Sequence, residues 1–125
     1  MKPAEKRVLE AIDFDAMYDF IDEIIATPSF GGEESKAQLI MATKLEELGL
    51  TVDQWEIDFT ELRKHPDFSM SYEREEGLGV VGTIGPDNGK SLILCGHIDT
   101  VASGDIENWD TIPLKATLKD GKLYG

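Results

Sequence analysis

The sequence predicts an α/β fold in which a mixed sheet is flanked by helices. Two amphipathic stretches, at about 14–26 and 33–48, come first, and strand-like segments follow. Glycine, proline and asparagine at 85–89 form a turn that favours an antiparallel pair of strands on either side. A later run of continuous apolar residues is typical of a strand buried on both faces. A chain of 125 residues has room for one hydrophobic core and not for a second domain.

Apolar residues spaced by three and four positions predict both helices. The first helix covers 14–26, and a short helix from Pro3 can precede it. It ends at Thr27-Pro28, because proline lacks a backbone donor and restricts the residue before it. The second helix runs from about Glu33 to Leu48, where Gly49 provides a carboxy-terminal cap. Both helices therefore have an apolar face that needs a sheet to cover it.

Alternating apolar residues predict the strands. Trp55, Ile57 and Phe59 alternate with polar residues, which predicts that they lie on the buried face of a strand. Val52 falls out of phase, which a bulge, a twist or a later strand start would each explain. Residues 60–76 are polar and irregular, with one helical turn at 61–64, and a strand follows at 78–84.

A hairpin is predicted near the carboxyl end of the sequence. Residues 114–118 and 122–124 would be its strands, because Asp120-Gly121 favours the positive φ angles of a tight turn. Its last strand would be an unpaired edge, and such an edge can support self-association.

The most informative segment is the strand predicted at 91–95, which delivers His97 and Asp99 at its exit. Ligand sites in α/β sheets lie beyond the carboxyl ends of strands. Residues i and i+2 of an extended chain project to the same side, so the Asp99 carboxylate can accept the second ring N–H of His97 and fix its tautomer for a metal. One histidine is far short of a zinc site, and a strand followed by a polar turn remains the plainer interpretation. Cys95, the sole cysteine, is expected to be a small buried residue.

Several segments together resemble the zinc-dependent metallopeptidase family of aminoacylases, carboxypeptidases, acetylornithine deacetylase and succinyl-diaminopimelate desuccinylase. The segments are LILCGHIDTV at 92–101, Trp109, Pro113 and Asp120-Gly121-Lys122-Leu123-Tyr124-Gly125. Two further segments resemble the deacylase branch of this family in particular. They are Thr27-Pro28-Ser29 with Gly32-Glu33-Glu34, and residues 61–68.

The resemblance implies that residues 1–125 are the amino-terminal part of a catalytic domain, a fragment that we expect to be inactive alone. It gives His97 the role of a metal ligand and Asp99 the catalytic role of orienting it. The complete enzyme would hold two zinc ions, with cobalt or manganese as alternatives, and would hydrolyse the amide bond of a small N-acyl-amino acid or peptide. In the family, an aspartate that bridges the metals follows the closing Tyr-Gly, and here it would lie past Gly125.

Two other interpretations stay open. The chain can be a stand-alone interaction or regulatory module that kept the scaffold and lost catalysis. It can also be an unrelated acidic α/β domain in which His97 and Asp99 are incidental, an interpretation that a hydrogen bond between them at a strand end within an open cleft would contradict.

Charge and composition exclude several classes of partner. The formal net charge of −13 repels nucleic acid and anionic membrane surfaces. The amino-terminal stretch lacks the apolar core of a signal peptide, and no run reaches membrane-spanning length, so we expect a cytoplasmic protein. His65 is expected to be exposed and structural, and Asp105, Glu107 and Asp110 to lie in a solvated loop.

Overall fold

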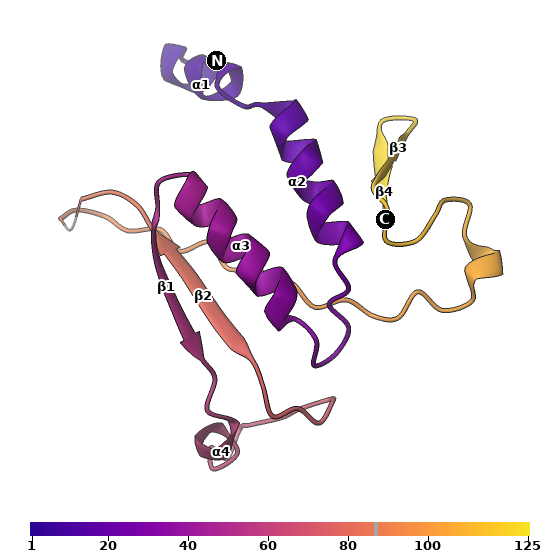
Figure 1. Ribbon diagram of the computed structural model, residues 1–125. Helices are drawn as coiled ribbons and strands as arrows, with labels where there is room; N and C mark the ends of the chain where they lie inside the picture. Colours follow the sequence, from indigo (N-terminus) through magenta and orange to yellow (C-terminus); the bar gives the residue numbers. More distant parts are fainter. Residues whose placement is uncertain (87) are drawn as a thin grey trace. The chain divides into compact units, whose positions relative to one another are not determined.

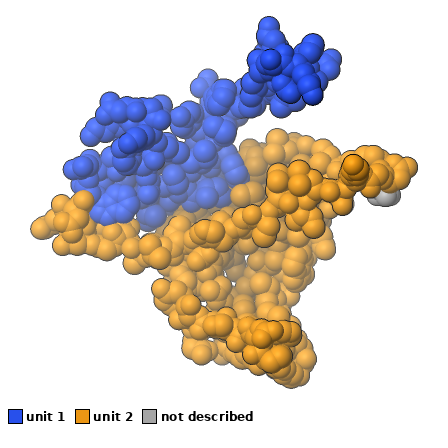
Figure 2. Space-filling model, turned by 180° about the vertical axis from the view of Figure 1, so that it is seen from behind, with its two compact units in different colours: residues 1–26, 109–125 blue, residues 27–108 orange. Residues whose placement is uncertain are grey.

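The computed structural model describes residues 1–86 and 88–125. They form two compact units, one made of residues 1–26 with 109–125 and the other of residues 27–108 (Figure 2). Each unit combines helices with a two-stranded antiparallel sheet, which agrees with a mixed α and β composition. Within the described residues, no helix has the length and apolar character needed to cross a membrane.

The first unit contains two helices and a carboxy-terminal hairpin. These elements are α1 (Pro3–Glu10), α2 (Phe14–Ala26), β3 (Thr117–Lys119) and β4 (Lys122–Tyr124). Helix α2 has the predicted bounds, and Asp13 caps its start by accepting a hydrogen bond from the amide of Ala16 at 3.0 Å. Asp120 and Gly121 have φ angles of 52° and 72°, so the predicted Asp-Gly turn is confirmed.

The second unit is built on a hairpin with a helix on one face. Its elements are α3 (Ser35–Glu47), β1 (Thr51–Glu56), α4 (Phe59–Leu62), β2 (Leu78–Thr83) and the 3₁₀ helix η1 (Ile106–Asn108). Strands β1 and β2 pair antiparallel from Thr51 opposite Thr83 to Glu56 opposite Leu78. Helix α3 lies along this hairpin, and α4 follows β1 at its far end (Figure 1).

Glycine contacts identify which face of the hairpin α3 covers. A Cβ on Gly82 would lie 3.1 Å from a side-chain carbon of Leu45 on α3, so Gly82 faces the helix. Val52 is opposite Gly82 and shares that face, whereas Trp55 packs on Gly79 on the other face. The prediction that Trp55 marks the buried face is therefore wrong in phase, and Val52, which fell out of phase, lies on the helix side.

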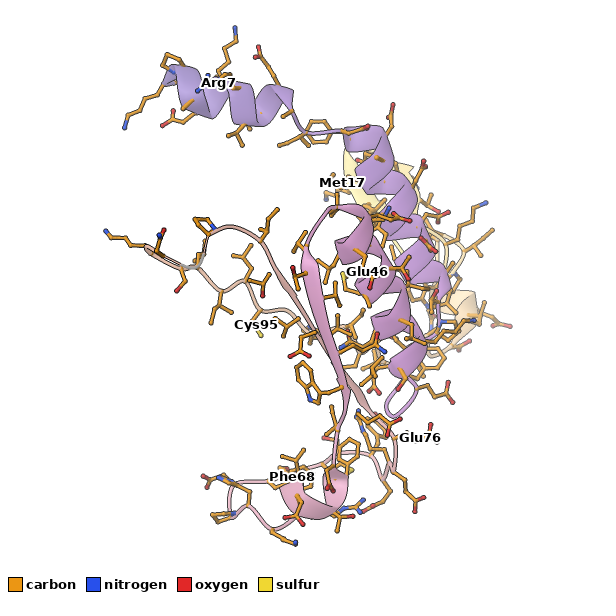
Figure 3. The ribbon with its side chains drawn as sticks, turned by 60° about the vertical axis from the view of Figure 1, so that its left-hand side comes forward. Arg7, Met17, Glu46, Phe68, Glu76 and Cys95 are labelled. Carbon is orange, nitrogen blue, oxygen red and sulfur yellow. The ribbon has the colours of Figure 1, made fainter. Side chains whose placement is uncertain are left out.

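The predicted strand at 91–95 does not form. Leu92, Ile93 and Leu94 belong to no strand and are 83%, 86% and 87% exposed. Cys95, labelled in Figure 3, is exposed too. The expectations of a strand buried on both faces and of a buried cysteine are wrong. An apolar run becomes a buried strand only beside other strands, and none of the described residues pairs with the backbone of 92–96.

The predicted mixed sheet is likewise not formed by the described residues. Strand β2 pairs with β1 and not with residues 91–95, and the two sheets are separate and antiparallel. The turn predicted at 85–89 includes Asp87, which lies outside the described residues. Among residues 1–86 and 88–125, parallel pairing is limited to a single bridge between Phe30 and Thr100. The fold is thus α/β in the coarse sense of helices with small antiparallel sheets.

We predict that Gly79→Ala lowers the free energy of unfolding by about 1–3 kcal/mol, because the added methyl group would overlap the indole ring of Trp55. Gly96→Ala is the matched control, since a Cβ there meets nothing within 4 Å and the change should not destabilise the chain. Urea unfolding followed by tryptophan fluorescence measures both. Equal stability of the two variants would contradict the packing of Trp55 on Gly79.

Candidate functional site

The segment that carries His97 and Asp99 is held by Ser29. The Ser29 hydroxyl donates a hydrogen bond to the carbonyl oxygen of Ile98 at 2.9 Å and lies 3.3 Å from the Thr100 hydroxyl. The Thr100 amide donates in turn to the Ser29 carbonyl oxygen at 2.9 Å. Ser29 is only 2% exposed, whereas Ile98 is half-buried and Thr100 is exposed, so these bonds are shielded from water on the Ser29 side. The residues on both sides of Asp99 are therefore fixed by one serine, an arrangement we call the Ser29 clasp.

His97 and Asp99 are in direct contact. Nδ1 of His97 lies 3.0 Å from Oδ1 of Asp99, and the imidazole is 85% exposed. With Nδ1–H donated to the carboxylate, Nε2 is the nitrogen available to a metal. The hydrogen bond predicted from their spacing is present, although an extended loop carries it and not the end of a strand.

The residues present fit a zinc site at one position only. A hydrolytic zinc ion takes about three protein ligands, and His97 has the oriented imidazole that one of them requires. Across residues 1–86 and 88–125, no group of three or more histidine, cysteine, aspartate or glutamate side chains could hold a metal ion. With His97 as its single protein ligand, a zinc ion would bind weakly.

A cavity of about 280 Å³ adjoins this contact. Its lining combines aromatic, hydroxyl and charged side chains from the α4 region and from the segment before β2 with Asp99, namely Phe59, Phe68, Ser69, Met70, Ser71, Tyr72, Arg74 and Asp99. Figure 3 shows Phe68 beside α4, at the end of the unit where the cavity lies. The volume suits a ligand the size of an amino acid.

Arg74 and Glu34 form the best-buried ion pair in the described part of the chain. Nη1 of Arg74 donates to Oε2 of Glu34 at 2.9 Å, and their side chains are 25% and 12% exposed. The other oxygen, Oε1, accepts the amide of Gly32 at 3.1 Å. The guanidinium also lies over the ring of Phe59, 6.0 Å from its centroid. Glu34 thus joins the loop after Ser29 to the wall of the cavity.

Glycines allow that loop to lie close to the wall. A Cβ on Gly31 would overlap the ring of Tyr72, and Gly32 has a φ of 99°, which favours glycine. From the sequence, Thr27-Pro28 and Glu33 are predicted only as helix boundaries, and the resemblance gives no site role to Ser29, Gly32 or Glu34. Their partners are 40 or more residues away, and no local pattern could have indicated them.

The remaining candidate residues lie as expected from the sequence. His65 is exposed, and its Nδ1 accepts a hydrogen bond from the Asp67 amide at 3.2 Å, which is a local structural role. Asp105 accepts the amide of Glu107 at 3.3 Å at the start of η1. Neither contact brings a further ligand to His97. In a comparison with models of known protein families, none matches this chain.

We predict that Ser29→Ala loosens the segment around Asp99 and lowers the free energy of unfolding by about 1–3 kcal/mol, because it leaves the Ile98 carbonyl without its partner. Amide hydrogen exchange should accelerate at Thr100. Ser91→Ala, at an exposed serine, is the control and should change neither quantity. Unchanged protection of Thr100 in Ser29→Ala would show that the clasp does not hold this segment.

Proposed function

We propose that the chain is the amino-terminal part of a metal-dependent hydrolase that cleaves the amide bond of N-acyl-amino acids or small peptides, similar to acetylornithine deacetylase and succinyl-diaminopimelate desuccinylase. The observation that carries the proposal is the contact between His97 and Asp99, which lies in the segment of strongest resemblance and is held by Ser29. The proposal retains the cytoplasmic location expected from the sequence.

In this proposal His97 binds the metal through Nε2, and Asp99 is the positioning residue behind it. A carboxylate that accepts Nδ1–H fixes the ring orientation and raises the basicity of the ligating nitrogen. The metal, expected as two zinc ions with cobalt or manganese as alternatives, would lower the pKa of bound water and polarise the scissile carbonyl. Of these steps, the described residues contribute the orientation of one ligand.

The exposed apolar run gives independent support. Leu92, Ile93 and Leu94 have the composition of an interior strand but no strand beside them. Such a run is expected where a larger sheet supplies the neighbours. The same larger domain would supply the ligands that the described residues lack, so we expect residues 1–125 alone to be inactive.

The exposed run also favours a second candidate, an interaction module on the same scaffold without catalysis. An extended segment with unpaired backbone groups can accept a strand from another polypeptide. The two candidates differ at His97, because only the hydrolase needs its imidazole to bind metal.

We predict that the 125-residue chain binds Zn²⁺ weakly through His97. In an NMR titration, the His97 ring signals should shift with added zinc, His97→Ala should abolish the response, and Asp99→Asn should weaken it by about 10-fold or more. His65→Ala is the matched control and should leave the titration unchanged. A zinc response that persists in His97→Ala would contradict the assigned ligand.

To test the hydrolase activity, the reading frame that follows Gly125 in the source gene must first be determined. If it continues, the longer product should contain zinc and hydrolyse N-acetyl-amino acids, and His97→Ala should abolish both. A longer product without metal and without hydrolysis would contradict the hydrolase and favour the interaction module.

A further inference from the structure

Arg74, one of the residues that line the cavity beside Asp99, has hydrogen-bond donors that the described residues do not use. We propose that Arg74 anchors the carboxylate of an amino-acid-like ligand in this cavity, an inference that rests on the proposed function for the identity of that ligand as substrate. The lining residues come from one compact unit, so the cavity is a property of residues 27–108 alone.

The first argument is the hydrogen bonding of Arg74. Arginine has five N–H donors, and within the described residues the side chain of Arg74 uses only Nη1, which donates to Glu34. Its Nε is buried and has no partner. A buried donor without an acceptor carries a free-energy penalty, so an acceptor oxygen from a ligand would be favoured there.

The second argument is the shape of the donor set. Glu34 occupies Nη1, which leaves the edge formed by Nε and Nη2 without a partner among the described residues. Two parallel N–H groups on one edge match the two oxygens of a carboxylate. Since Nε is shielded, the ligand must displace part of the wall. Residues 69–74 belong to no helix or strand, so such a displacement breaks no hydrogen bond of a helix or sheet.

The third argument concerns charge. Arg74 contributes one positive charge, while Glu34 and Asp99 contribute negative charges close by, and the whole chain has a formal charge of −13. A polyanion such as a nucleotide would be repelled. A monocarboxylate with a neutral remainder fits better, because only one negative charge needs to reach the guanidinium. The aromatic side chains of Phe59, Phe68 and Tyr72 can cover that neutral remainder.

The fourth argument is position. Asp99 lines the cavity and hydrogen-bonds His97, so a ligand held at Arg74 would lie beside the positioning residue of the proposed metal site. An N-acyl-amino acid has both required parts, a carboxylate and an amide. Arg74 would therefore select substrates with a free carboxylate over their neutral amides.

The test compares two probes on the metal-free 125-residue chain in the presence of a chelator. N-acetylglycine carries the carboxylate, and N-acetylglycinamide is the neutral control of the same size. We expect chemical-shift titrations to give at least 5-fold tighter binding of N-acetylglycine, with shifts at Arg74 and Tyr72. Arg74→Gln should abolish this preference, and Lys64→Gln, which removes the same charge from an exposed side chain nearby, should retain it.

Glu34→Gln separates ligand binding from a purely structural role. Removing the carboxylate that competes for the guanidinium should tighten N-acetylglycine binding about 3-fold or more, whereas a structural pair predicts no gain. The double variant Glu34→Gln, Arg74→Gln removes both charges, so a loss of preference there cannot come from an unpaired glutamate. Equal binding of the two probes to the unmodified chain, or weaker N-acetylglycine binding by Glu34→Gln, would overturn the inference.

The outcome is independent of zinc. A carboxylate preference in a chain that does not bind zinc at His97 would support Arg74 as a carboxylate anchor and contradict only the hydrolase. Zinc binding at His97 with no carboxylate preference would overturn the role of Arg74 and leave the proposed function intact.

Discussion

The hydrogen bond from Ser29 to the Ile98 carbonyl is the contact on which the rest of the candidate site depends. It joins residues 69 positions apart and is part-buried, with Ser29 only 2% exposed. Because the backbone of 92–96 has no partner in the described structure, that segment cannot position His97 from the amino-terminal side. The position of Asp99, and through it the orientation of His97, is therefore set by the clasp.

Polar contacts have this importance because the apolar core is small. Of the hydrophobic residues that the structure describes, only Ala37 and Ala42 are fully buried, and both are on α3. A core of this size stabilises the hairpin under α3 but does not extend to the cavity. There the ion pair of Glu34 with Arg74 holds the loop to the wall, and a pair that is mostly buried is screened by solvent less than a surface pair. The site is thus built from a few long-range polar contacts on a marginal scaffold.

The sequence predicts the features that depend on neighbours in the chain and fails where they depend on distant ones. Helix α2 and the turn at Asp120 follow from spacing and φ preference, and the contact of His97 with Asp99 follows from a separation of two residues. The buried face of β1 was assigned to Trp55, because the alternation does not say which side α3 will cover. The strand at 91–95 failed for a related reason, since apolar composition describes what a segment can bury and not whether anything covers it.

The described structure has an apolar run without neighbouring strands and a histidine, His97, without further candidate metal ligands beside it. In the proposed hydrolase, both would have one physical origin. Zinc ligands in an α/β domain come from the ends of several strands, so a segment that is not paired with other strands also lacks the ligands they would bring. His97 lies three residues after Leu94, at the end of the run. Any strand that paired with Leu92–Leu94 would place its own terminal side chains near that end. Covering the apolar run and completing the metal site would then be a single event, in which the clasp of Ser29 has already oriented the first ligand.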